Sequence, residues 1–188
     1  TLWIVKATPK GESLKLEVAK KVKFDFSGRV ITAHPSKPLL YVTATSGDPG
    51  KVPGAVVFLN KDGSYQKHQN INFNDGACYL SLDKENRHIL GVSYGNGRLN
   101  VYPLDDQGIP GKAVTTIDEG KKEAHCVLLP PDGKNVYIPY VKGNLAILQY
   151  AYDGNTGKVT PLKPKEAKPP LGSGPRHMAY HPTLPMVY

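Results

Sequence analysis

The chain has 188 residues, a hydrophobic content of 39% and a formal net charge of +8. It is long enough for one domain with a core of its own, and its longest apolar runs are too short to span a bilayer. The lysines are scattered rather than gathered with aromatic residues in one run, which argues against a nucleic-acid site. The basic balance weakly favours an anionic small molecule as ligand, although a solvated lysine-rich surface explains the same charge.

A short sequence pattern, which predicts a strand, a polar turn and a second strand, recurs along the chain. Its anchors stand about 48 to 51 residues apart, at Pro35, Asp83, Pro131 and Pro182. A period of this length built of strands is typical of a β-propeller blade. The sequence therefore predicts an all-β propeller of four-stranded antiparallel blades, as a single domain over residues 1–188. The approximate repeats are 1–28 (partial), 29–76, 77–124, 125–175 and 176–188 (partial).

The opening segment fits the second half of a blade, with a third strand at Leu2–Lys6, a turn at Pro9–Gly11 and a fourth strand at Leu14–Val18. In the later repeats, alternation and turn residues predict the other strands. First strands are expected at Val30–Ala33, Cys126–Leu129 and His177–Tyr180; second strands at Leu39–Thr43 and Val136–Ile138; third strands at Arg98–Leu104 and Asn144–Tyr150. Five prolines between Pro161 and Pro175 predict a long extended connection.

The chain begins in a predicted third strand and stops at Tyr188 in a predicted second strand. Two arrangements follow: the half-blades pair and close a small four-bladed ring, or the chain is a piece of a larger propeller. We favour the larger propeller, because a natural terminus usually has a turn or tail beyond its last core residue. The chain should then form an open arc, whose ends are covered by missing C-terminal blades or by an oligomer partner.

Two cysteines, Cys78 and Cys126, occupy the same place in consecutive repeats. They are interpreted as small buried hydrophobic residues rather than as a disulfide framework. A reducing compartment is the default, and no signal peptide opens the chain. We therefore expect a cytoplasmic protein that is not inserted in a membrane.

The repeat also predicts which residues meet in space. The first strand of each blade lines the central channel, so the residues just before those strands surround one channel mouth. The equivalent positions are Arg29, Ala77, His125 and Arg176. Two arginines and an imidazole suit the binding of a carboxylate or phosphate beside a titratable base. The alternative is that the arginines bond loop carbonyls and the histidine is structural.

The other histidines point to structural roles. His34 and His181 precede prolines in turns, which favours turn stabilisation, and His68 and His88 are expected to be solvated. Alternation predicts that the side chain of His177 points away from the channel mouth. No set of residues has metal spacing, and no phosphate-binding or dinucleotide fingerprint is present, so no metal or cofactor is expected.

Residues 172–182, Gly-Ser-Gly-Pro-Arg-His-Met-Ala-Tyr-His-Pro, closely resemble the G-x-GPRH and HP motif of the bacterial lactonase family with a seven-bladed β-propeller. Residues 92–104 and 124–137 resemble the same family, which includes a 6-phosphogluconolactonase and a fungal 3-carboxy-cis,cis-muconate lactonizing enzyme. The resemblance implies that this chain is the N-terminal half, about four blades' worth of seven. It also implies that His125 is the catalytic histidine, that Arg176 is a site arginine, and that an acidic partner follows Tyr188.

These observations lead to one expected function and two alternatives. The expected function is a lactonase that hydrolyses an anionic sugar lactone such as 6-phosphogluconolactone. His125 would act as acid or base beside Arg176, with Arg29 and His177 binding substrate. The alternatives are a muconate-type lactonizing cycloisomerase, in which His125 moves a proton, and a propeller that binds a ligand without turnover.

Overall fold

The computed structural model describes residues 1–44, 46–48, 50–142, 145–181 and 183–188, so the expected strand residue Asn144 and the repeat anchor Pro182 lie outside the described residues. The described ranges hold strands, turns and loops but no helix, and therefore none long and apolar enough to cross a membrane. The strands are β1 (Leu2–Lys10), β2 (Ser13–Val22), β3 (Val30–Ala33), β4 (Leu39–Thr43), β5 (Val52–Leu59), β6 (Tyr65–Phe73), β7 (Tyr79–Leu82), β8 (His88–Val92), β9 (Leu99–Pro103), β10 (Thr115–Ile117), β11 (Asn135–Tyr140), β12 (Ala146–Asp153) and β13 (Lys158–Ala167).

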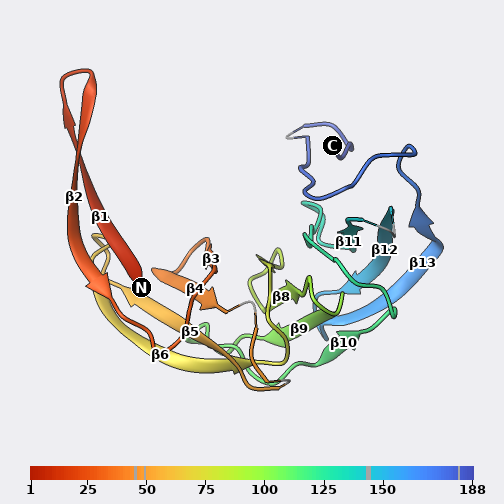
Figure 1. Cartoon of the computed structure of the whole chain (residues 1–188), viewed down its shortest axis with the longest axis horizontal. Coiled ribbons are helices and arrows are strands. Elements are labelled where there is room, and N and C mark those ends of the chain that lie inside the picture. The colour runs from red at the N-terminus through yellow and green to blue at the C-terminus, as the bar shows by residue number, and fades with distance from the viewer. Residues whose placement is uncertain (45, 49, 143–144, 182) are drawn as a thin grey trace.

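These strands form antiparallel sheets of consecutive strands. A hairpin of β1 and β2 is followed by a first blade, β3-β4-β5-β6, a second blade, β7-β8-β9-β10, and a three-stranded third blade, β11-β12-β13. The sheets stand side by side along an open arc, with the lowest-numbered strand of each blade toward the concave side (Figure 1). The predicted fold class, an all-β propeller of four-stranded antiparallel blades, is confirmed.

The middle strands of each blade are the most deeply buried. Every residue of β8 is buried, and so are four of the five residues of β4. The outer strand β6 is mostly exposed, as expected for a polar strand at the edge of a sheet. β3 and β4 begin and end at the residues that the repeat predicted, because the turn chemistry between them is local.

The core lies between neighbouring blades rather than within one of them. Side chains of the first and second blades form one cluster, including Tyr41, Phe73 and Ile89. Those of the second and third blades form another, including Leu90 and Ile138. Burial of apolar area between the faces is therefore what fixes one blade beside the next.

Buried tyrosines add directional bonds across the blade boundaries. Three tyrosine hydroxyl groups donate hydrogen bonds to the second blade or its loops, at distances of 2.8 to 2.9 Å. Tyr41 donates to the carbonyl oxygen of Gly108, Tyr140 to that of Gly97, and Tyr152 to the carboxylate of Asp83. Since a buried hydroxyl without a partner is costly, each bond favours one relative placement of the two blades.

The first strand of the third blade is a correction to the sequence prediction. A continuous strand was expected at Cys126–Leu129, but the structure has only isolated bridges, Ala124 with Tyr140 and Leu128 with Tyr137. The segment accompanies β11 without forming a regular ladder. One reason is that Pro139 on β11 accepts a bond from the amide of His125 but has no N–H to return.

Two further boundaries differ from the prediction. The proline-rich stretch was expected to be a connection from Pro161 onward, but β13 continues to Ala167 and pairs with β12. Prolines are tolerated there because β13 is an edge strand. The opening hairpin is also longer than expected, since Pro9 and Lys10 belong to β1 rather than to the turn.

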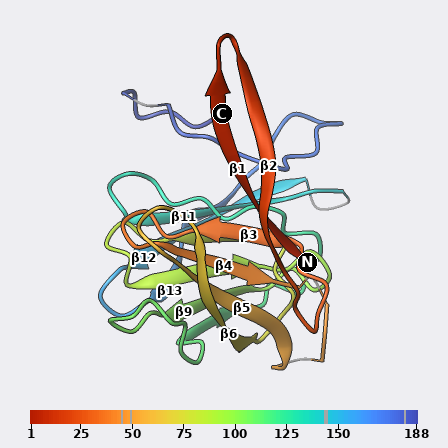
Figure 2. The same ribbon diagram turned by 90° about the vertical axis from the view of Figure 1, so that its left-hand side faces the viewer.

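The two ends of the arc do not meet. Within the described residues β1 pairs with β2, and the segment near the other end pairs locally, Tyr180 with Val187. The closed four-bladed ring, which required β1 to pair with residues 186–188, is not formed. The β1–β2 hairpin instead projects from the blades (Figure 2).

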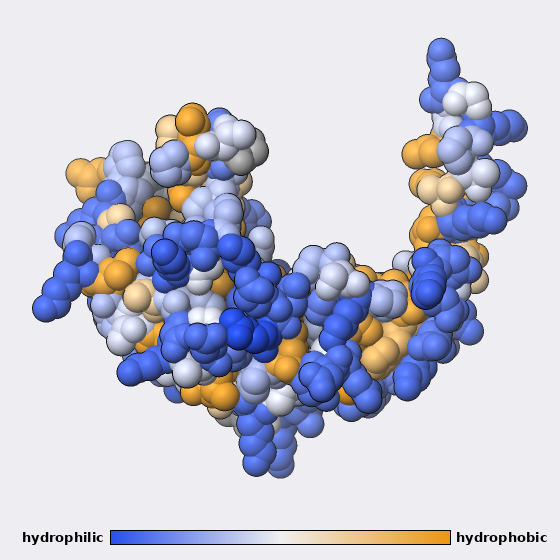
Figure 3. Space-filling model, turned by 180° about the vertical axis from the view of Figure 1, so that it is seen from behind, coloured by the Kyte–Doolittle hydropathy of each residue, from blue (hydrophilic) through white to orange (hydrophobic). Residues whose placement is uncertain are grey.

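One face of the projecting hairpin is apolar. Its cross-strand pairs are Val5 with Val18, Ala7 with Leu16 and Pro9 with Leu14, whereas the opposite face carries pairs such as Lys6 with Glu17. Leu14 and Leu16 are 64% and 66% exposed. Apolar side chains therefore lie in the open on this arm, beside charged ones (Figure 3).

Candidate active site

A cavity of about 310 Å³ lies where the predicted channel-mouth residues come together. It is lined by Arg29, Gly76, Cys78, Tyr94, Gly95, His125 and Arg176. Arg29 directly precedes β3. His125 lies between β10 of the second blade and β11 of the third. Equivalent positions in successive repeats thus converge on one space. The fourth position, Ala77, is only 4% exposed and packs in the core between the first and second blades.

His125 is half-buried and held by its main chain. Its amide donates to the carbonyl oxygen of Pro139 at 3.1 Å, which fixes the residue at the edge of β11. Its ring meets the ring of Tyr94 edge-on, with centroids 5.7 Å apart. The Nδ1 atom is buried and has no hydrogen-bond partner among the described residues. One ring nitrogen of His125 is therefore buried without a partner in the described part of the chain.

The surroundings of His125 favour its neutral form. Burial lowers the pKa of the imidazole from its ordinary value, and the positive charge of Arg176 lowers it further, with smaller effects of His177 and Arg29. Both causes act in the same direction, because burial and nearby cations each penalise the imidazolium. At neutral pH the ring can therefore accept a proton.

The two arginines of the cavity are free to bind an anion. Arg29 and Arg176 are exposed, and no side chain in the described part of the chain forms an ion pair or hydrogen bond with either guanidinium. Arg98 shows the contrast, since its guanidinium lies 2.8 Å from a carboxylate oxygen of Asp118 and 3.7 Å from one of Asp75. An unpaired guanidinium at a cavity matches a planar or tetrahedral oxyanion.

His177 is not among the residues that line the cavity, but its ring lies beside that of His125. Its ring centroid is 4.9 Å from that of His125 and 6.0 Å from that of Tyr79, so the side chain is beside His125 rather than turned away. Residues 172–179 form no regular strand, so the two-residue period from which its orientation was predicted does not apply there.

Besides two glycines, two residues that line the cavity, Cys78 and Tyr94, had no site role in the sequence analysis. Cys78 was interpreted as a buried hydrophobic residue, but it is only partly buried and its thiol lies 3.2 Å from the carbonyl oxygen of Ala124. Burial raises the pKa of this thiol to about 11, so it is not a thiolate nucleophile at neutral pH. Tyr94 follows the end of β8, which pairs antiparallel with the start of β7. The pairing of these two strands could therefore have placed Tyr94 at the channel mouth, beside the residues that precede β7.

The remaining histidines are structural, although not all in the expected way. His34 and His181 do stabilise turns: each Nδ1 accepts two backbone amides, at 3.0 and 3.2 Å in the first case and 2.9 and 3.2 Å in the second. His88 was expected to be solvated but is 4% exposed, with Nδ1 3.1 Å from the Asp83 carboxylate. His68 is also partly buried and bonded to the Tyr65 hydroxyl at 2.8 Å.

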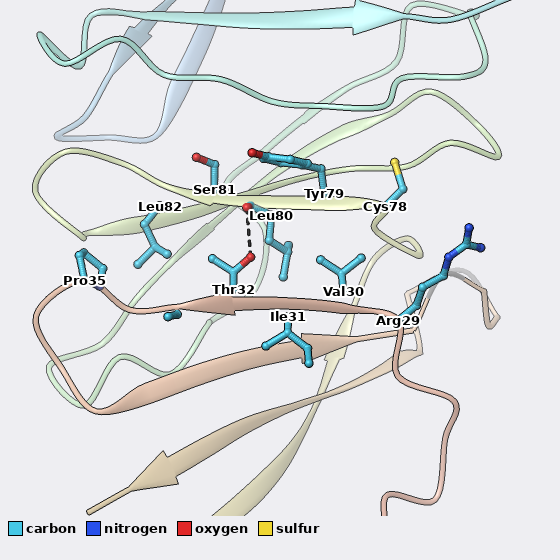
Figure 4. Close-up of a pocket in the computed structure, with 11 residues that line it drawn as sticks. Arg29, Val30, Ile31, Thr32, Pro35, Cys78, Tyr79, Leu80, Ser81 and Leu82 are labelled. Carbon is cyan, nitrogen blue, oxygen red and sulfur yellow. Dashed lines mark hydrogen bonds between the residues drawn. The ribbon is translucent and has the colours of Figure 1, made fainter. Parts of the chain in front are cut away.

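No group of three or more histidines, cysteines and acidic residues suited to a metal ion occurs within the described ranges. A groove of about 670 Å³ adjoins the cavity, between β3 and β7 on the channel side. Arg29 and Cys78 lie together at one end of this groove, and Pro35 lies at the other (Figure 4). The cavity and the groove share these two lining residues, which therefore stand at the boundary between them.

Comparison with known proteins finds relatives that are similar to this chain in sequence. The chain is 31% identical over 127 residues to a 6-phosphogluconolactonase of Cronobacter sakazakii, covering 68% of this chain and 37% of that protein. It is 33% identical over 111 residues to a 6-phosphogluconolactonase of Photorhabdus laumondii, covering 58% and 33%. The matched part of the chain thus spans about a third of the length of these relatives.

Among solved structures, the fold is similar to that of the periplasmic gluconolactonase PpgL of Pseudomonas aeruginosa. The TM-score is 0.75 at 19% sequence identity, over 91% of this chain and 52% of that one. The family described as lactonase with a seven-bladed β-propeller matches residues 3–188. With its blades, its repeat and this match over nearly the whole sequence, the chain belongs to the seven-bladed β-propeller lactonase family.

Proposed function

We propose that the protein hydrolyses an anionic sugar lactone such as 6-phosphogluconolactone. The observation that carries the proposal is the cavity in which a half-buried His125 of lowered pKa lies with Arg29 and Arg176, whose guanidinium groups have no partner among the described residues. Such a set offers a base and two anion-binding groups in one space. The names of the curated relatives support a phosphorylated gluconolactone as substrate.

The chemistry of the proposed reaction follows from these side chains. His125 accepts a proton from water as the water oxygen attacks the lactone carbonyl carbon. Arg176 stabilises the negative charge that develops on the carbonyl oxygen. The bond between the carbonyl carbon and the ring oxygen then breaks, and the proton passes from His125 to that oxygen, giving a hydroxy acid. Arg29 and His177 bind the substrate's polar groups.

Substitution of the proposed base tests this function. In the full-length protein, His125→Ala should lower lactone hydrolysis above the uncatalysed rate by roughly 100- to 10,000-fold, the usual contribution of a general acid–base group. His68→Gln is the matched control, because His68 lies outside the cavity and its loss removes no cavity group. Full activity in His125→Ala would remove His125 from the mechanism.

Two other functions remain as alternatives for the same cavity. In a muconate-type cycloisomerase His125 would transfer a proton to carbon, and product analysis by NMR separates that reaction from hydrolysis. A ligand-binding propeller is favoured by one observation: in the described part of the chain no carboxylate lines the cavity. Thermal stabilisation by phosphosugars that is lost in Arg176→Ala, with no lactone turned over, would support binding alone.

A further inference from the structure

The two arginines of the cavity differ in what surrounds them. Arg176 lines the cavity but not the groove, and its neighbour in sequence, His177, has its ring 4.9 Å from that of His125. Arg29 lines both the cavity and the channel groove, at their junction. Arg176 therefore belongs to the side of the cavity that holds His125, and Arg29 to the side that adjoins the groove.

Arg29 is anchored by its backbone but not by its side chain. Its amide donates to the carbonyl oxygen of Thr43 at 3.0 Å. The preceding Gly28 lies so close to Val42 that a Cβ there would be 2.8 Å from a methyl carbon of that side chain. This close approach fixes the start of β3, while the guanidinium extends from the end of the strand near Cys78 (Figure 4).

Among the described residues that line the groove, Arg29 carries the one charge. The remaining lining residues of the groove are apolar or carry a hydroxyl or thiol. The hydroxyl of Thr32 on β3 donates to the carbonyl oxygen of Leu80 on β7 at 3.2 Å, which links the two strands that form the groove. A ligand that extends from His125 toward the groove therefore meets one cation, Arg29, at the junction. Because a guanidinium can make two charge-assisted bonds to one oxyanion, this position is suited to a phosphate distant from the reacting ester.

We propose that Arg29 is the specificity-determining residue of the site: it binds the phosphate of a phosphorylated lactone at the junction with the groove, while Arg176 serves the reacting carbonyl beside His125. The proposal rests on the proposed function and divides the roles of the two arginines within it. It assigns the preference for a phosphorylated over an uncharged sugar lactone to one side chain.

The test compares two substrates in the full-length protein, 6-phosphogluconolactone and uncharged gluconolactone. In Arg29→Gln, kcat/KM for the phosphorylated lactone should fall by roughly 10- to 100-fold more than for the uncharged one, the range of a lost charge-assisted contact. Arg29→Lys should keep part of the preference for the phosphorylated lactone, because lysine keeps the positive charge but cannot make the two parallel hydrogen bonds of a guanidinium. In Arg176→Gln both substrates should lose rate by similar factors.

Lys61→Gln is the control for loss of one positive charge, since Lys61 lies in the exposed turn between β5 and β6. Unchanged circular dichroism and Tm in each variant show that the fold is kept. An equal loss for both lactones in Arg29→Gln, or no loss, would overturn the assignment while leaving lactone hydrolysis intact.

If the wild-type protein hydrolysed neither lactone, the proposed function would fail, and the role of Arg29 would still be measurable. Titration with 6-phosphogluconate and with gluconate, followed by calorimetry, then reports the preference directly. Tighter binding of the phosphorylated acid that disappears in Arg29→Gln supports the phosphate position, and a preference that survives in that variant overturns it.

Discussion

At the scale of single residues, the protonation of His125 is set by its neighbours. Burial lowers the pKa of the imidazole below its ordinary value of 6.5, and Arg176 adds to the effect. Base catalysis needs the neutral ring, so activity should be present at neutral pH and be lost as the pH falls through the lowered pKa.

NMR titration of the His125 ring measures this pKa without relying on turnover. We expect a midpoint below 6.5 in the wild-type protein and a higher midpoint in Arg176→Gln, because one repulsive cation is gone. Lys61→Gln should leave the midpoint where it is. A wild-type ring that titrates at or above 6.5 would mean that neither burial nor Arg176 acts as the structure indicates.

At the scale of the strand, β5 depends on a residue without a side chain. A Cβ on Gly54 would lie 2.6 Å from a ring carbon of Phe73 and 2.8 Å from the carbonyl oxygen of Val42. One of these neighbours is backbone and the other is a fully buried ring, so neither can move away cheaply. The first blade therefore packs at a distance that only glycine permits.

Gly54→Ala should lower the free energy of unfolding by about 1 to 3 kcal/mol, the usual cost of overpacking a core. Gly111→Ala is the matched control, because a Cβ there would meet its nearest atoms at 3.4 Å or more, within ordinary contact. Urea unfolding of the two variants checks the difference. Equal stability of both would show that β4 and β5 can separate without loss.

At the scale of the whole molecule, the arc leaves apolar surface in water at its ends. The hairpin face that includes Leu14 and Leu16 is the clearest case, and each Å² left exposed costs about 25 cal/mol. We propose that further blades or a second copy of the chain cover these faces. Contiguous apolar patches of this kind usually mark an interaction surface.

A polypeptide limited to residues 1–188 should therefore self-associate. Light scattering after gel filtration should show oligomers, and Leu14→Lys combined with Leu16→Lys should shift the population toward monomer. The unsubstituted polypeptide at the same concentration serves as the reference. A stable monomer of residues 1–188 that binds no hydrophobic dye would contradict the proposal.

The blades and three of the residues that line the cavity could be predicted from the sequence alone. Turn residues and two-residue alternation are local signals, so β3 and β4 could be located to the residue. The repeat placed Arg29, His125 and Arg176 at equivalent positions, and equivalent positions of a propeller meet at one channel mouth. That inference needed no knowledge of side-chain packing.

The contacts between these elements could not be predicted from the sequence, because they arise when the blades pack together. His88 is buried because its partner Asp83 also accepts a bond from Tyr152, which is 69 residues farther along the chain and in another blade. His177 approaches His125 because its segment is irregular, and the third blade lacks a regular first strand beside Pro139. Such contacts depend on the free energy of packing one blade against the next, which no local pattern encodes.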